Sequence, residues 1–277
     1  MPAFAPVRFI CNNYWQTCAQ HHVDVLVHAA AHLYTQQRFD PKAVKDGDRV
    51  FVKTDLIDMF IARLLPLIRA RFVLITGHSD LSPGEWAMLQ VHRCPRITQW
   101  YAVNAIWTDH KTIALPMGLS EPDRPNGDQD VVARVLASLS QTDEKLDGVF
   151  CPVASPTHPV RAELQALHHP ALLKTESRMS YEEYLRALAR HRFVLCPRGN
   201  GIDVHRVYEA LIMRTIPIYV TDTVPALFHR VGMPVLVVQS IKDLVGLLDD
   251  LPDWTPDWDA VLEFCTAEAA GRVYGLA

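Results

Sequence analysis

The stretch from residue 192 to residue 220 constrains the fold more than any other part of the chain. Its apolar residues 193–196 predict a buried strand, which Pro197 ends. A short loop follows with two of the chain's 12 glycines, and residues 204–214 then predict a helix. Residues 216–220 are mostly β-branched and predict a second strand. A strand, loop, helix and strand in this order form the basic unit of a parallel α/β sheet.

The polar residues of this stretch favour an anion-binding site. Asp203 has the chemistry of a helix N-cap, and Arg198 lies in the glycine loop. His205, Arg206 and Glu209 share one face of the predicted helix, because residues three and four apart are neighbours on a helix. A helix N-terminus behind a glycine loop attracts anions, arginines match phosphate, and a carboxylate accepts hydrogen bonds from a sugar diol. The alternative, an Arg–Glu pair on a solvated helix face, leaves the glycine loop unexplained.

The run CPRGNGIDVHRVYEALIMRTIPIYV, residues 196–220, resembles the C-terminal-domain motif of exostosin-like glycosyltransferases of the family 47 type and of related GT-B enzymes. Their pattern is an apolar strand, Pro-Arg-Gly, a variable loop, Arg, Glu-Ala, a small residue and Ile-Pro-Ile/Val. The chain departs from it at Arg214 and Thr215, where the family often has a small residue. The resemblance implies a GT-B-like α/β fold with two Rossmann-like domains facing a cleft. It also implies a nucleotide-sugar donor, no tightly held metal or cofactor, and inversion at the anomeric carbon.

The resemblance also implies which residues bind the donor. Arg198 and Arg206, with backbone N–H groups, would hold the diphosphate, and Glu209 would bind the ribose hydroxyls. His205 would contact the phosphate or the transferred sugar. Pyrimidine nucleotides are the tendency of the family, so we expect a UDP-linked donor. The complete expected donor site is Arg198, Gly199, Asn200, Gly201, Asp203, His205, Arg206 and Glu209.

An inverting transferase needs one general base near the acceptor hydroxyl. The predicted buried strand 72–76 is followed by His78 and Asp80, and Asp55 follows the predicted strand 48–53. Ligands of open α/β sheets lie outside the carboxyl ends of the strands, where these side chains are expected. Our candidates for the catalytic base are Asp80, and behind it Asp55, His78 and Glu121.

A second and weaker match lies in the first half of the chain. Residues 115–119, Leu-Pro-Met-Gly-Leu, resemble the Pro-Ile-Gly-Leu-type turn that carries the chain toward the cleft in these enzymes. Asn104 and Lys111 precede this turn in a similar order, and Glu121 follows it. The turn therefore places Glu121 near the expected junction of two domains.

The length of 277 residues exceeds the usual size of one hydrophobic core, so we expect two domains. The expected division is an acceptor-side Rossmann-like domain over residues 1–145 and a nucleotide-sugar-binding domain over residues 146–277. By resemblance, a final helix of the second domain packs back on the first.

Composition excludes several other classes. The formal net charge of −4 argues against broad nucleic-acid binding, which requires a basic face. No window reaches the roughly 18 consecutive apolar residues of a membrane span. The six cysteines lack paired zinc-ligand spacing, so we expect reduced thiols and a cytoplasmic enzyme.

Helix-capping residues account for the one metal-like motif. Asp128-Gln129-Asp130 has the Asp-x-Asp form of metal-dependent transferases, but it follows a polar turn and opens a predicted helix. Capping is the better explanation, because acidic residues suit a helix N-terminus. Ser180 and Glu183 form a second signature, a capping box ahead of the helix 181–191.

The sequence thus predicts a glycosyltransferase that moves a sugar from a nucleotide-sugar donor to a glycan, polyol or other hydroxyl acceptor. Two alternatives stay open. A nucleotide-sugar epimerase would need acid and base groups on both faces of the sugar. A non-catalytic nucleotide-sugar-binding protein would keep the donor motif without a base.

Overall fold

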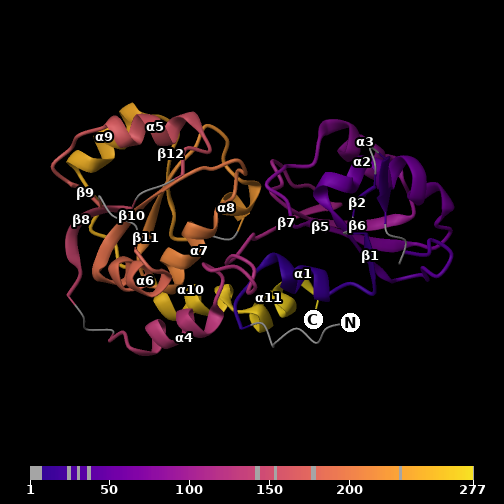
Figure 1. Cartoon of the computed structure of the whole chain (residues 1–277), viewed down its shortest axis with the longest axis horizontal. Coiled ribbons are helices and arrows are strands. Elements are labelled where there is room, and N and C mark those ends of the chain that lie inside the picture. The colour runs from indigo at the N-terminus through magenta and orange to yellow at the C-terminus, as the bar shows by residue number, and fades with distance from the viewer. Residues whose placement is uncertain are drawn as a thin grey trace. The chain divides into compact units, whose positions relative to one another are not determined.

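The computed structural model describes residues 8–23, 26–29, 32–35, 39–140, 144–152, 155–175, 179–230 and 233–276. Two compact units make up the chain (Figure 1). Unit 1 comprises Met1–Cys11, Gly118–Val224 and Phe228–Ala277, and unit 2 comprises Asn12–Met117 and Pro225–Leu227. Each unit contains one five-stranded parallel sheet with helices, so the expected α/β class with two parallel-sheet parts is confirmed.

The sheet of unit 2 has the strand order β1-β4-β5-β6-β7. Its strands are β1 (His21–Val23), β4 (Arg49–Lys53), β5 (Phe72–Gly77), β6 (Ile97–Val103) and β7 (Thr112–Leu115). Every pair in it is parallel. The central strand β5 is buried along almost all of its length, as an apolar strand in a parallel sheet must be. The carboxyl ends of β4 and β5 are joined where the Thr54 hydroxyl donates to the Gly77 carbonyl over 3.3 Å.

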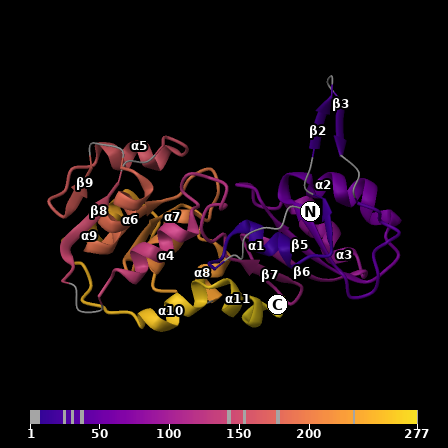
Figure 2. The same ribbon diagram turned by 60° about the horizontal axis from the view of Figure 1, so that its bottom comes forward.

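Helical segments and one hairpin complete unit 2. The helical segments are α1 (Asn12–Thr17), η1 (Thr54–Leu56), α2 (Ile57–Met59), η2 (Phe60–Leu64), η3 (Leu65–Leu67) and α3 (Glu85–Arg93). The antiparallel hairpin consists of β2 (Leu26–Ala29) and β3 (His32–Thr35). Figure 2 shows it as a two-stranded element separate from the five-stranded sheet.

The sheet of unit 1 has the order β12-β11-β10-β8-β9 and is also parallel throughout. Its strands are β8 (Leu146–Cys151), β9 (Leu172–Lys174), β10 (His191–Pro197), β11 (Ile216–Val220) and β12 (Leu236–Val238). The two strands predicted within residues 192–220 are therefore the centre of this sheet, β10 and β11. Both are buried along almost their whole length.

Helices lie on both faces of the unit 1 sheet, and further helices pack on these. The helices of the unit are α4 (Gln129–Ala137), α5 (Pro159–Ala166), α6 (Tyr181–Arg190), α7 (His205–Ile212), α9 (Ile241–Asp249), α10 (Trp258–Cys265) and α11 (Ala267–Tyr274). The short α8 (Ala226–Arg230) contains the division between the units. Figure 1 shows α5 and α9 on one side of the strands and α6 and α7 on the other. Phe193 and Leu195 of β10 face the first pair, packed with Leu164 and Leu244.

The units do not divide at residue 145 as expected. The first described residues of the chain and the residues after Gly118 form hydrogen bonds within unit 1. Leu119 N–H donates to the Ile10 carbonyl over 2.8 Å, and Ile10 N–H donates to the Cys265 carbonyl over 3.0 Å. Helix α4 packs against α6. Residues 8–11 and 118–140 therefore belong with the C-terminal half. The final helices also lie in this unit, where α10 packs on α7.

Both capping interpretations are confirmed. The Asp128 carboxylate accepts from the backbone N–H groups of Asp130 and Val131 over 2.9 and 3.2 Å, which makes it the N-cap of α4. Ser180 and Glu183 form a reciprocal capping box at the start of α6. This cap satisfies backbone N–H groups at the start of the helix that carries Tyr181 and Tyr184.

Candidate functional site

The predicted site lies at the carboxyl end of β10, the middle strand of the unit 1 sheet. Pro197 ends β10, the glycine loop spans residues 198–204, and α7 begins at His205. Arg198 N–H still donates to the Val220 carbonyl of β11 over 3.0 Å. The loop thus leaves the sheet at the position where ligands of open α/β folds bind.

Arg161 of α5 holds the backbone at the start of this loop. Its Nε donates to the Arg198 carbonyl over 2.7 Å and its Nη2 donates to the Pro197 carbonyl over 3.2 Å. Nη1 donates to the Ser155 carbonyl over 3.1 Å. A Cβ at Gly199 would lie 3.0 Å from Arg161 Nη2, so glycine lets the guanidinium approach the loop closely. The sequence interpretation missed Arg161, because it lies in a separate helix and in no recognised motif.

Arg198 is the second guanidinium at the loop. It forms a 2.5 Å ion pair through Nη1 with the exposed Asp222, while its own side chain is only 13% exposed. Its Nε is buried and has no hydrogen-bond partner within the described part of the chain. Burial and the positive charge of Arg198 lower the pKa of His158, the N-cap of α5. Arg198 therefore retains an unused donor at the place where the sequence predicted an anion.

Glu209 and Tyr184 connect α7 to α6. The Tyr184 hydroxyl donates to the Glu209 carboxylate over 2.9 Å, and Glu209 is only 6% exposed. The guanidinium carbon of Arg206 lies 6.0 Å from the centre of the Tyr184 ring, a cation–π distance. Burial raises the pKa of Glu209, opposed by the Tyr184 hydrogen bond and the Arg206 charge. Burial and Glu209 also raise the pKa of Tyr181.

Positive charges gather around the end of β10. Burial, and then the charge of Arg206, lower the pKa of Arg161. The two guanidinium groups therefore repel one another electrostatically. Burial raises the pKa of Cys196 in β10 to about 12, while the charges of Arg206 and Arg161 act in the opposite direction. Like charges held close together repel, and a bound anion relieves that repulsion. The arrangement is suited to binding a polyanion such as a diphosphate.

The structure corrects the predicted role of Asp203 as the helix cap. Val204 is the N-cap of α7, and it makes no side-chain capping hydrogen bond. Asp203 is 2% exposed and accepts instead from the Tyr208 hydroxyl over 2.6 Å and from Val204 N–H over 2.9 Å. The Tyr219 hydroxyl donates to the neighbouring Ile202 carbonyl. The Asp203 carboxylate therefore binds the Tyr208 hydroxyl and does not cap the helix. This hydrogen bond fixes the buried side of the loop to α7.

The remaining predicted donor residues surround this braced segment. His205 Nδ1 donates to the Gly118 carbonyl over 2.8 Å, which ties the first turn of α7 to the turn at residues 116–119. Gly118 has a φ of +75°, and a Cβ there would lie 2.1 Å from the Ile10 carbonyl oxygen. This turn is the Leu-Pro-Met-Gly-Leu segment singled out in the sequence, and its Gly118 carbonyl binds the first residue of α7. Gly201 is buried, and Asn200 is exposed on the loop.

The candidate bases occupy different settings, and three of them belong to unit 2. Asp80 is exposed, after β5. His78 has a left-handed backbone with φ of 56°; its N–H donates to the Asn12 amide oxygen over 3.1 Å, and its ring meets Phe51 edge-on. Asp55 forms a 3.2 Å ion pair with Lys53.

Glu121, the fourth candidate, belongs to unit 1 and forms a 3.2 Å ion pair with Arg124. The predicted donor residues therefore belong to unit 1 together with Glu121, and the other three candidate bases belong to unit 2. Within the described residues, no group of three or more His, Cys, Asp or Glu side chains is arranged to hold a metal ion. None of the described helices is long and apolar enough to span a membrane.

Residues 157–251, about a third of the chain, match the family model of the RXYLT1 C-terminal domain, a xylosyltransferase-related family. This span contains Arg161, the capping box, the glycine loop and Glu209. No curated protein matches the chain significantly. The family match points to a glycosyltransferase, in agreement with the resemblance found in residues 196–220.

Two solved structures are similar to the chain at low TM-scores. One is an α,α-trehalose-phosphate synthase (UDP-forming) from Burkholderia vietnamiensis, with 11% identity, a TM-score of 0.45 and coverage of 84% of this chain and 73% of that one. The other is an α,α-trehalose-phosphate synthase (UDP-forming) from Burkholderia xenovorans in complex with glucose-6-phosphate, with 8% identity, a TM-score of 0.36 and coverage of 84% and 71%. This likeness assigns no substrate to the chain.

Proposed function

We propose that this protein is a glycosyltransferase of the GT-B type that binds a nucleotide-sugar donor in unit 1. The observation that carries the proposal is the gathering of Arg161, Arg198 and Arg206 around the glycine loop ahead of α7, beside the buried Glu209. A helix N-terminus and guanidinium groups together match a diphosphate. The family match over residues 157–251 supports sugar transfer at this site.

In this proposal the donor diphosphate lies at the glycine loop, next to Arg198 and Arg206. Their positive charge offsets the negative charge that develops on the departing nucleotide, and electrostatic stabilisation of this kind is usually the largest contribution to catalysis. Arg161 positions the loop by holding its carbonyl groups. The transfer requires no resident metal for the leaving group, inverts the anomeric carbon, and uses a UDP-linked donor.

Glu209 binds the ribose hydroxyls of the donor in this proposal. Tyr184 occupies one side of its carboxylate with a 2.9 Å hydrogen bond and fixes its orientation. Asp80 is the proposed general base that takes the proton of the acceptor hydroxyl, with His78, Asp55 and Glu121 as rivals. The acceptor is a glycan, a polyol or another hydroxyl compound.

Calorimetric titration with UDP tests the donor site. We expect Arg206→Ala and Glu209→Ala each to weaken UDP binding by about tenfold or more, which corresponds to about 1.4 kcal/mol. Arg190→Ala is the matched control, because Arg190 is an exposed arginine in the last turn of α6. Circular dichroism checks that each variant is folded. Unchanged UDP affinity in both site variants would sink the donor assignment.

A second measurement separates a transferase from an inert binder. A panel of nucleotide sugars is incubated with the protein, and the release of free nucleotide is followed with and without sugar and polyol acceptors. A transferase releases nucleotide faster when its acceptor is present and shows slow hydrolysis without it. Binding without any release would favour a non-catalytic protein, and conversion of the sugar without release would favour an epimerase.

A further inference from the structure

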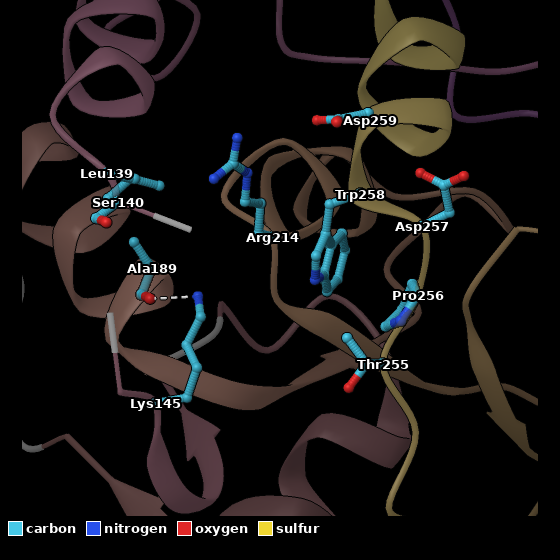
Figure 3. Close-up of a pocket in the computed structure, with 10 residues that line it drawn as sticks. All are labelled: Leu139, Ser140, Lys145, Ala189, Arg214, Thr255, Pro256, Asp257, Trp258 and Asp259. Atoms are coloured by element: carbon cyan, nitrogen blue, oxygen red, sulfur yellow. Dashed lines mark hydrogen bonds between the residues drawn. The ribbon is translucent and has the colours of Figure 1, made fainter. Parts of the chain in front are cut away.

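Unit 1 contains a second polar site, at the other end of α7 from the glycine loop. A cavity of about 320 Å³ lies between the end of α4, the turn after α7 and the start of α10 (Figure 3). Its charged and aromatic lining residues are Lys145, Arg214, Asp257, Trp258 and Asp259. Since α7 has eight residues, its two ends are about 12 Å apart along the helix axis. The cavity is therefore separate from the donor cluster.

Arg214 occupies a backbone position that normally belongs to glycine. Its φ is 56°, in the left-handed region, immediately after the C-cap residue Met213 of α7. Thr215 N–H donates to the Ala210 carbonyl over 2.9 Å, which closes the helix in the manner that favours glycine or asparagine at this position. An arginine in this conformation carries backbone strain that glycine would not. Strained positions of this kind cluster at functional sites, so the Arg214 side chain is a candidate for a function.

The guanidinium group of Arg214 is incompletely hydrogen-bonded. Its Nε and Nη1 are buried, and neither has a hydrogen-bond partner among the residues that the structure describes. Lys145 differs, because its Nζ donates to the Ala189 carbonyl over 2.5 Å (Figure 3). The same Nζ also donates to the Met213 carbonyl over 3.4 Å. Buried charged donors are unfavourable unless they are paired. Arg214 lines the cavity, so an anion bound there would offset the incompletely paired charge of its guanidinium.

The cavity wall formed by the start of α10 indicates which further chemical groups a ligand would have. The indole of Trp258 packs partly on the hydrophobic core and also lines the cavity, as a flat apolar surface. Asp259 is exposed at the rim, while Asp257 accepts a hydrogen bond from Ala260 N–H over 3.2 Å as the N-cap of α10. A flat ring beside carboxylate acceptors suits the C–H face and the hydroxyl groups of a sugar.

We propose that this cavity is a binding site for an anionic sugar, one that bears a phosphate or a carboxylate. Arg214 binds the anionic group, Trp258 stacks on the sugar ring, and Asp259 accepts hydrogen bonds from its hydroxyl groups. The volume of the cavity is at the lower end of the range for small-molecule sites, about 300 Å³ and above, which suits a monosaccharide derivative. The proposal does not rest on the donor site, because it uses other residues of unit 1.

A simpler role for Arg214 is attraction to the negative end of α7, since cations near a helix C-terminus are favourable. The two roles predict different outcomes for Arg214→Gly. Loss of a dipole interaction would lower the Tm of this variant in a salt-dependent manner. A ligand-binding role leaves its Tm at or above that of the wild type, because glycine relaxes the backbone while the binding group is removed.

The test is calorimetric titration of the full chain with glucose 1-phosphate and with glucuronate, which distinguish a phosphate from a carboxylate. Glucose and inorganic phosphate are the references, each expected to bind at least about tenfold more weakly than the better anionic sugar. Arg214→Gly and Trp258→Ala should each weaken that sugar by about tenfold or more. Arg214→Lys keeps the charge without the planar group and should weaken it less than Arg214→Gly, and it serves as the test if Arg214→Gly does not fold.

Arg206→Ala separates this proposal from the donor site. Binding of the anionic sugar to the cavity should be unchanged in Arg206→Ala, and UDP binding should be unchanged in Arg214→Gly. Failure of UDP to bind the wild type would count against the proposed function alone. The cavity proposal is overturned if neither anionic sugar binds, if inorganic phosphate binds as tightly as the sugars, or if Arg214→Gly binds them as the wild type does.

Discussion

The hydroxyl of Tyr184 on α6 donates a 2.9 Å hydrogen bond to the carboxylate of Glu209 on α7. The guanidinium of Arg206 lies over the same tyrosine ring. This contact joins the capping-box helix to the helix that follows the glycine loop, and it holds the proposed ribose-binding carboxylate in a buried position. The orientation of Glu209 thus depends on a residue outside its own motif.

The first prediction concerns the pH dependence that Glu209 creates. Burial raises the pKa of Glu209, so the folded state holds this proton more tightly than the unfolded state does. Its contribution to stability is present below the unfolded pKa of about 4.3 and is lost as the pH rises through the raised folded value. Relative to Glu209→Gln, the wild type should therefore lose free energy of unfolding over this window. Urea titrations from about pH 4 to about pH 8 measure the difference.

Glu182→Gln provides a control of opposite sign. The hydrogen bonds from Arg134 and Arg186 lower the pKa of Glu182. Its contribution is therefore present above its unfolded pKa and is lost as the pH falls. A stability difference between the wild type and Glu209→Gln that stays constant with pH would contradict the first prediction.

The second prediction concerns Arg161, which positions the glycine loop. In Arg161→Lys a single ammonium group replaces a guanidinium that makes three hydrogen bonds, each 3.2 Å long or shorter. We expect a loss of about 1–3 kcal/mol in the free energy of unfolding and a UDP affinity lower by about tenfold. Arg186→Lys is the control, because Arg186 is an exposed arginine that pairs with Glu182. Full UDP affinity in Arg161→Lys would remove Arg161 from the donor site.

The third prediction concerns Gly118, whose carbonyl holds His205. An alanine Cβ at this position would lie 2.1 Å from the Ile10 carbonyl oxygen, and the φ of +75° strains any side chain. Gly118→Ala should lower the free energy of unfolding by about 2 kcal/mol or more, because backbone atoms would have to move. Gly246→Ala in α9 is the matched control: nothing lies within 4 Å of its Cβ, and alanine should stabilise that helix by about 1 kcal/mol. Equal stabilities for the two variants would contradict the steric explanation.

The fourth prediction concerns the catalytic base. Asp80→Asn should abolish nucleotide release in the presence of acceptor and leave UDP affinity unchanged, because a base acts on the acceptor proton. His78→Gln, Asp55→Asn and Glu121→Gln are assayed in parallel. Asp55 and Glu121 already form ion pairs with Lys53 and Arg124. Normal turnover in Asp80→Asn, together with loss of turnover in one rival, transfers the role to that residue.

The fifth prediction concerns the backbone strain at Arg214. Arg214→Gly and Arg214→Ala remove the same guanidinium, but only glycine relaxes a φ of 56°. The glycine variant should be more stable than the alanine variant by about 1 kcal/mol. Chemical unfolding of both variants measures this difference. An alanine variant as stable as the glycine variant would show that the turn adjusts without strain.

Much of the architecture was predictable from local patterns. The apolar run 193–196 and the β-branched run 216–220 predicted β10 and β11, because buried parallel strands consist of apolar and β-branched residues. The helix caps Asp128 and Ser180 were predictable because capping depends on residues only a few positions away. These features depend on short-range chemistry.

The candidate site was predictable in part. The glycine loop, Arg206 and Glu209 lie within one motif, so spacing along the chain placed them together. Arg161 and Tyr184 were missed because they approach the loop from α5 and α6, helices that precede it in the chain. The N-cap assignment of Asp203 was wrong because Tyr208 recruits its carboxylate.

Local sequence patterns were sufficient to predict the parallel α/β class, the central strands and the position of the glycine loop, since these follow from periodicity, helix capping and glycine placement. Three contacts became known from the folded structure alone: Arg161 binds the carbonyl groups of the loop, Gly118 accepts from His205, and Arg214 and Trp258 line one cavity. The physical reason is that these contacts join side chains far apart in the chain. Their partners are set by how helices pack on the sheet, and local patterns carry no record of that packing.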